Sequence, residues 1–151
     1  MSEITLTADE QEIALAETGA VLAAAVRPEY RSELALLAAA IGEGRLLPEQ
    51  AETLEQVVEL ALQAGRIRAV YGPPGEQAAL KLYRRLPRGA ALTESAREVS
   101  AALGSLRGRT LEGASLTAIG PGSYTLSLTA GEARLSVRLD RQGARLTSVE
   151  V

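Results

Sequence analysis

The sequence lacks several of the residue types on which most enzyme chemistry depends. Among its 151 residues there is no cysteine, histidine, tryptophan, phenylalanine or asparagine, and there is one methionine. Without histidine and cysteine, the chain cannot build a Ser–His or Cys–His nucleophile or the common zinc sites. Any general base would have to be Asp, Glu, Lys or Tyr. The composition therefore favours a protein that is not an enzyme, and no residue is a candidate for catalysis, metal binding or cofactor binding.

The acidic residues that remain fit structural roles. The two aspartates stand at the start of a predicted helix (Asp9) and in a predicted turn (Asp140). Glutamates recur at spacings of three and four on two predicted helices, which could bring carboxylates together. A di-metal carboxylate site normally combines such glutamates with histidine. We therefore expect these side chains to lie on solvated helix surfaces: Glu52, Glu55, Glu59, Glu94 and Glu98.

The charged residues are also unusual, because Lys81 is the only lysine among the 16 basic residues. The Arg, Ala, Gly and Leu content indicates a high-GC genome, and the missing Cys and Asn, both thermolabile, suit a heat-adapted source. The net charge of −3 disfavours a general nucleic-acid binder. No apolar run approaches the ~20 residues that span a bilayer, and no signal-peptide pattern follows Met1. We expect a cytoplasmic protein that does not bind membranes.

The clearest pattern lies in the last stretch of the chain, residues 109–151. Tyr124, Leu126 and Leu128 alternate with serines and threonines, and a second run, residues 133–139, alternates in the same way. This period of two predicts strands with one apolar and one hydroxyl-bearing face. The links between the runs are short and contain glycine, which is typical of hairpin turns. We expect a four-stranded antiparallel meander.

The outer strands of this meander are less regular. In the last run, Leu146 has one parity and Val149 and Val151 the other, so either a bulge brings them to one face or the edge strand has mixed faces. The first strand, about residues 110–119, contains Gly113 and ends at a Gly-Pro-Gly turn. The fold class is therefore α+β: about five helices, followed by a four-stranded antiparallel meander that packs on helices through one face.

Capping residues and apolar stripes locate the helices. Thr7 and Glu10 form a capping-box pattern, and Gly19 lies within the helix that follows, where a close helix–helix contact would explain it. Residues 1–6 fit either a strand fragment or a disordered lead, and residues 66–71 fit either a strand or a helical turn. Residues 72–75, Gly-Pro-Pro-Gly, predict a rigid break. The expected helices are 7–26, 28–41, 48–64, 76–86 and 93–106.

Two domain segments follow from these elements. Residues 1–44 form a predicted helical hairpin, which is a candidate dimerisation arm. Residues 45–151 combine the remaining helices with the meander, and we expect them to form one compact unit with the hairpin. The glycines around residue 43 mark the boundary.

One cluster of basic residues is a candidate surface for an anionic partner. Cations near a helix C-terminus are also favoured by the helix dipole, which explains the cluster without any partner. Two arginines of the meander would enlarge the patch if packing brought them close. The six residues are Lys81, Arg84, Arg85, Arg88, Arg134 and Arg138. The Gly-Pro-Pro-Gly turn is not a phosphate loop, because no Gly-Lys-Ser/Thr follows it.

Three functions remain open. The first is a non-enzymatic protein-interaction or self-associating module, a homodimer or the binder of another protein. The second is a small-ligand pocket protein, since helices followed by a curved meander resemble cystatin-like and NTF2-like folds in outline. That resemblance implies a concave sheet holding a ligand near Tyr124, Leu126, Leu135 and Val137, although no motif matches either family. The third is weak binding of nucleic acid or another anionic partner through the arginine cluster.

Overall fold

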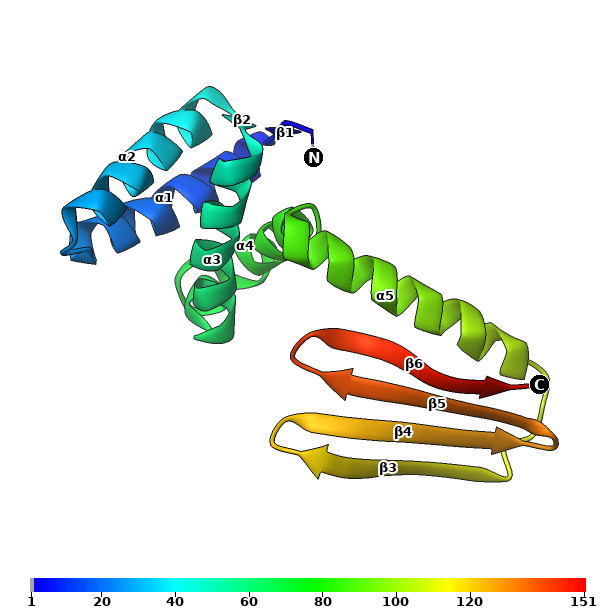
Figure 1. Cartoon of the computed structure of the whole chain (residues 1–151). Coiled ribbons are helices and arrows are strands. Elements are labelled where there is room, and N and C mark those ends of the chain that lie inside the picture. The colour runs from blue at the N-terminus through cyan, green and yellow to red at the C-terminus, as the bar shows by residue number, and fades with distance from the viewer. Residues whose placement is uncertain (1) are drawn as a thin grey trace. The chain divides into compact units, whose positions relative to one another are not determined.

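A computed structural model describes residues 2–151 of the chain (Figure 1). Five helices precede a four-stranded antiparallel sheet, which confirms the predicted α+β class. The chain divides into two compact units, the first ending at Ala90 and the second comprising Ala91–Val151. The last helix before the sheet begins in the first unit and continues into the second.

The first unit is helical and has a core of its own. Its helices pack against one another through fully buried leucines such as Leu34, Leu54 and Leu82. Two short strands near the N-terminus and after the second helix pair antiparallel. Of residues 1–6, which fitted either a strand or a disordered lead, Ile4 and Thr5 therefore form a strand. The elements are β1 (Ile4–Thr5), α1 (Ala8–Ala24), α2 (Pro28–Glu43), β2 (Arg45–Leu46), α3 (Pro48–Gln63) and α4 (Arg66–Tyr83).

This core adds to the expected packing. The sheet packs on a helix through its apolar face, as predicted, while α1–α4 bury their apolar stripes among themselves. The α1–α2 hairpin packs on α3 and α4. The capping box of α1 forms as predicted, with the Glu10 N–H donating to Thr7 Oγ1 (3.3 Å) and the Thr7 N–H donating to Glu10 Oε1 (3.2 Å).

The ambiguous segment 66–71 is helical and forms the first part of α4. The predicted break is present but narrow, because only Gly72 leaves helical geometry (φ 72°, ψ −175°). Pro73 and Pro74 then occupy the first turn after the break, where proline is tolerated. The helix predicted from residue 76 therefore begins earlier. Gly75 is required by a close approach, since a Cβ there would lie 2.2 Å from the Tyr71 Cβ.

The explanation offered for Gly19 is wrong. Gly19 is exposed on α1, and a Cβ added there would have no neighbour within 4 Å. No close helix contact therefore requires glycine at this position, which loses helix propensity without any gain in packing.

The second unit consists of one helix and the predicted meander. The helix begins at Pro87, earlier than the start expected at residue 93. Proline is favoured in the first turn of a helix, and Pro87 takes that position here. The strands lie in the order β3-β4-β5-β6. The elements are α5 (Pro87–Leu103), a 3₁₀ turn η1 (Gly104–Leu106), β3 (Gly113–Gly120), β4 (Ser123–Ala130), β5 (Ala133–Asp140) and β6 (Gly143–Glu150).

Of the two readings left open for the last strand, the register shows the bulge. Ser136 pairs with Ser148 and Val137 with Leu146, which leaves Thr147 as the extra residue of β6. This insertion brings Leu146 and Val149 to the same face. The core of the second unit lies where Val99 of α5 packs on Leu135 and Val137.

Candidate interaction surface

Helix α5 covers only part of the apolar face of the sheet. Leu135 and Val137 of β5 are 2% and 1% exposed beneath Val99, whereas all eight residues of β3 are exposed. Figure 1 shows α5 beside β6 and β5, with β3 at the far edge of the sheet. The apolar face at the β3 side is therefore open to solvent.

The apolar side chains on this open side form a surface that we call the open face. It comprises Leu103, Leu111, Leu116 and Tyr124, of which Leu116 is 61% exposed at the centre of β3. Leu116 pairs with Leu126 of β4, which is partly buried and belongs to the core of the unit. The open face is thus continuous with the packed core rather than isolated from it.

A groove adjoins the open face where the C-terminal end of α5 meets β4. Its volume is about 490 Å³, and leucines of α5, the following turn and β4 line it. Arg107 and Arg109 also line it, so the groove combines apolar side chains with two cations.

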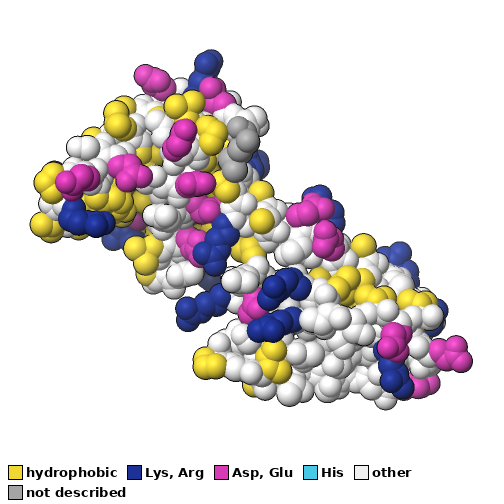
Figure 2. All heavy atoms as spheres, in the orientation of Figure 1, with side chains coloured by type: hydrophobic (Ala, Val, Ile, Leu, Met, Phe, Trp, Pro, Cys, Tyr) yellow, Lys and Arg dark blue, Asp and Glu magenta, His cyan; other side chains and the backbone are white. Residues whose placement is uncertain are grey.

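The opposite face of the sheet is polar, as the alternation predicted. Register pairs place four serines in one row across the strands: Ser115, Ser127, Ser136 and Ser148. In Figure 2 the surface of this unit turned to the viewer is largely white, the colour of uncharged polar side chains and backbone. This face offers hydroxyl groups for hydrogen bonding but few apolar atoms.

The two edges of the sheet differ in their protection against pairing. Natural edge strands avoid unwanted pairing by means of charges, proline or bulges. The β6 edge carries Arg145 and Glu150 and the bulge at Thr147. The β3 edge, Gly113–Gly120, has no charged residue and no proline along its eight residues, and its only irregularity lies near its end, at Ala118–Gly120. β3 is therefore the edge that is available for pairing.

The predicted basic cluster divides between the two units. In the first unit, Arg85 Nη1 lies 2.7 Å from Glu10 Oε1, and Arg88 Nη1 lies 3.4 Å from Glu59 Oε1. Lys81 and Arg84 line an open hollow beside the start of α1. The cluster is thus partly neutralised by carboxylates, and its role toward an anionic partner stays a prediction.

The two sheet arginines of the predicted cluster, Arg134 and Arg138, lie on the polar face in the second unit. Arg138 Nε donates to Asp140 Oδ2 at 3.2 Å, and Arg145 Nη2 donates to the same oxygen at 2.9 Å. The pKa of Asp140 is lowered mainly by the hydrogen bond from the Gln142 N–H, and to a smaller extent by the hydrogen bond from Arg145. Arg134 lies opposite Glu150 in the register.

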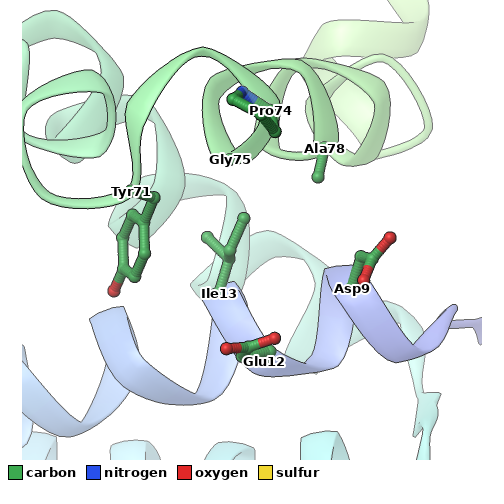
Figure 3. Close-up of a pocket in the computed structure, with 7 residues that line it drawn as sticks. All are labelled: Asp9, Glu12, Ile13, Tyr71, Pro74, Gly75 and Ala78. Carbon is green, nitrogen blue, oxygen red and sulfur yellow. The ribbon is translucent and has the colours of Figure 1, made fainter.

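A second hollow lies between α1 and α4 in the first unit (Figure 3). It has a volume of about 250 Å³, and its polar groups are the carboxylates of Asp9 and Glu12 and the hydroxyl of Tyr71. Tyr71 donates to Glu17 Oε1 at 2.9 Å, while Arg66 Nε donates to Glu17 Oε2 at 2.8 Å. These bonds hold Tyr71 and Arg66 as structural partners of a buried carboxylate.

Tyr71 is expected to ionise at unusually high pH. Burial, followed by its hydrogen bond to Glu17, raises its pKa from 10.0 to about 12. Because the folded state favours the protonated hydroxyl, this contribution to stability is complete below pH 10 and is lost as the pH rises through about 12. We follow tyrosine ionisation by ultraviolet absorbance as the pH rises. The absorbance change at the highest pH should be absent in Tyr71→Phe and present in Tyr30→Phe. A Tyr71 that ionises near pH 10 would contradict the bonding described here.

Sequence reasoning missed three buried glutamates. Glu10, Glu17 and Glu55 are 1%, 2% and 8% exposed. Glu55 was expected on a solvated surface, which is wrong: its Oε2 accepts from the backbone N–H of Arg88 (2.6 Å) and of Gly89 (3.2 Å). A carboxylate is favourable there because the first N–H groups of a helix lack partners. No local pattern in the sequence indicated this burial, because the partners of these carboxylates lie far away along the chain.

Within residues 2–151, His, Cys, Asp and Glu side chains do not gather in groups of three that could hold a metal ion. None of the helices in that range has the length and apolar content needed to cross a bilayer. Comparisons of the chain with protein-family models, with curated proteins and with solved structures found no match.

Proposed function

We propose that this protein is a non-enzymatic protein-interaction module that self-associates through the β3 side of its C-terminal sheet. The observation that carries the proposal is an edge strand without charge or proline next to an apolar face that its own helix leaves open. Exposed apolar patches that border a core are typical of interaction sites. Addition of a strand to a free sheet edge is a common mode of protein recognition.

The contact surface is placed in the second unit because the hairpin of the first unit already has partners. Leu34, Leu37 and Ile41 of α2 are at most 1% exposed within the core of that unit. The hairpin's main apolar stripe is thus not left for another chain. This moves the expected self-association from the predicted arm, residues 1–44, to the sheet.

The alternative of a ligand pocket has less support. Such a pocket would open over Leu135 and Val137, and Val99 packs on both side chains. The remaining hollows are open at the surface. We therefore rank the pocket protein second and the binding of anions third, as the sequence suggested.

Replacing Leu116 by glutamate tests the proposal. Burying a carboxylate without a partner costs several kcal/mol, so we expect Leu116→Glu to weaken self-association at least ~100-fold, which corresponds to about 2.8 kcal/mol. The fold should persist, because Leu116 is 61% exposed. Light scattering and sedimentation velocity over a range of micromolar concentrations measure the change.

Leu60→Glu is the matched control, because Leu60 lies on α3 of the first unit and is 63% exposed. It should associate like the original protein. A protein that stays monomeric at every concentration would refute the proposal, and equal loss of association in both variants would remove the assignment to β3.

A further inference from the structure

We infer that the partner of β3 is β3 of a second copy, paired antiparallel about a two-fold axis that passes midway between the two copies of Leu116. The inference rests on the proposed self-association and names the contact that would produce it. Pairing of this kind would join two four-stranded sheets into one sheet of eight strands.

The first step is the set of registers that a two-fold axis allows. In an antiparallel pair, residues directly opposite each other have side chains on the same face. Because faces alternate along a strand, the two sheets can keep their apolar faces on one side only if the axis sets one residue directly opposite its own copy. We name each axis by that residue. The candidate axes near the middle of β3 are Ser115, Leu116 and Thr117.

Only the axis at Leu116 matches like side chains over the five central residues, 114–118. It places Leu116 opposite its own copy, Ala114 opposite Ala118, and Ser115 opposite Thr117. Leucine therefore meets leucine on the apolar face, and hydroxyl meets hydroxyl on the polar face. An axis at either neighbouring residue would set Leu116 opposite an alanine.

The second step is charge. An isologous contact pairs the strand with a copy of itself, so a charged residue near the axis would lie close to the same charge of the other copy. Gly113–Gly120 carries no charged side chain, and hence no repulsion opposes this pairing. A charged edge would favour pairing with a strand of opposite charge from another protein. The β3 edge carries no charges and so offers no such preference.

The third step is what pairing would satisfy. Alternate residues of an edge strand direct their backbone N–H and C=O groups away from the sheet. Pairing would bond these groups and would bury Leu116, the most exposed leucine of the second unit. The resulting interface is small, and small interfaces are typical of weak or transient association.

Disulfide trapping tests the register directly, since the chain has no cysteine and a single introduced one can cross-link only between copies. In the proposed register the two Cα atoms of residue 116 would lie about 5.5 Å apart, within the range of a disulfide. A register shifted by one axis position would separate them by about 8 Å. We expect Leu116→Cys to form a covalent dimer under mild oxidation, whereas Leu60→Cys, with similar exposure, should remain largely uncrosslinked.

A mixture of Ser115→Cys and Thr117→Cys chains gives an independent reading on the polar face. The mixed disulfide should predominate over either homodimer, and mass spectrometry distinguishes the three products. A dimer in light scattering that forms neither the Leu116→Cys disulfide nor this mixed disulfide would overturn the β3 pairing and leave self-association standing. A monomer at every concentration would overturn both.

Discussion

Arg85→Ala is expected to lower the free energy of unfolding by about 3 kcal/mol, the lower end for a broken buried pair, because it leaves a buried carboxylate without a partner that is itself 37% exposed. Glu10 is 1% exposed and accepts from Arg85 Nη1 through both oxygens, at 2.7 and 2.8 Å. The other guanidinium nitrogen, Nη2, donates to the carbonyl of Thr5 in β1. Loss of the arginine would therefore destabilise the start of α1 and the β1–β2 pair together. Urea unfolding followed by circular dichroism measures the effect.

An exposed ion pair supplies the control. Arg97 lies 2.8 Å from Glu94 on α5, with side chains that are 71% and 59% exposed, and such pairs contribute about 0–1 kcal/mol. Arg97→Ala should therefore change stability little. The double variant Glu10→Gln, Arg85→Met should recover much of the loss, since the glutamine keeps the capping box and no charge stays buried. If Arg85→Ala unfolds no more easily than Arg97→Ala, the buried pair does not stabilise this fold.

Gly89→Ala is expected to destabilise the first turn of α5 by about 3 kcal/mol, since a side chain has no room there. A Cβ at Gly89 would lie 1.8 Å from the carbonyl oxygen of Tyr83 and 2.6 Å from its carbonyl carbon. These are backbone atoms at the end of α4, so the chain itself must move. Movement would also disturb the bonds from the N–H groups of Arg88 and Gly89 to Glu55. Hydrogen exchange at these two amides should rise together with the loss of stability.

Gly19→Ala is the matched substitution, at a helical glycine where a Cβ has no neighbour within 4 Å. It should stabilise the protein by about 0.5–1 kcal/mol through helix propensity alone. The two changes differ only in the space available, and they should have opposite signs. A neutral Gly89→Ala would show that α4 and α5 are not held as closely as described.

The meander could be predicted because its information is local. Alternation in residues 124–128 and 133–139 specifies the faces, and the glycine-containing turns specify the connections. The changed parity of Leu146 and Val149 indicated either a bulge or an edge strand with mixed faces, and the register decided for the bulge at Thr147. The predicted helix boundaries were less accurate where a proline is compatible with both the end of one helix and the start of the next. Pro87 can end one helix or begin the next, and tertiary contacts with Glu55 decide between them.

The packing of the helices could not be read in the same way. An apolar stripe shows that a helix needs a partner but not which partner, and the sequence did not indicate that α1–α4 bury their stripes among themselves. Buried carboxylates are similar: Glu17 looks like a surface residue until Arg66 and Tyr71 are brought to it in space. The candidate surface needed both kinds of information. The meander already predicted that the first strand lies at an edge, but the expected strand, residues 110–119, included Glu112. The uncharged bounds of β3 and its exposure came only with the fold.

The protected edge of the sheet has a consequence for the size of the assembly. Once two β3 strands have paired, the outermost strands on both sides would be β6, with Arg145, Glu150 and the extra residue Thr147. Such strands resist further addition. The association would therefore terminate at two subunits, without growth into fibrils or larger polymers, and raising the protein concentration should saturate a single species.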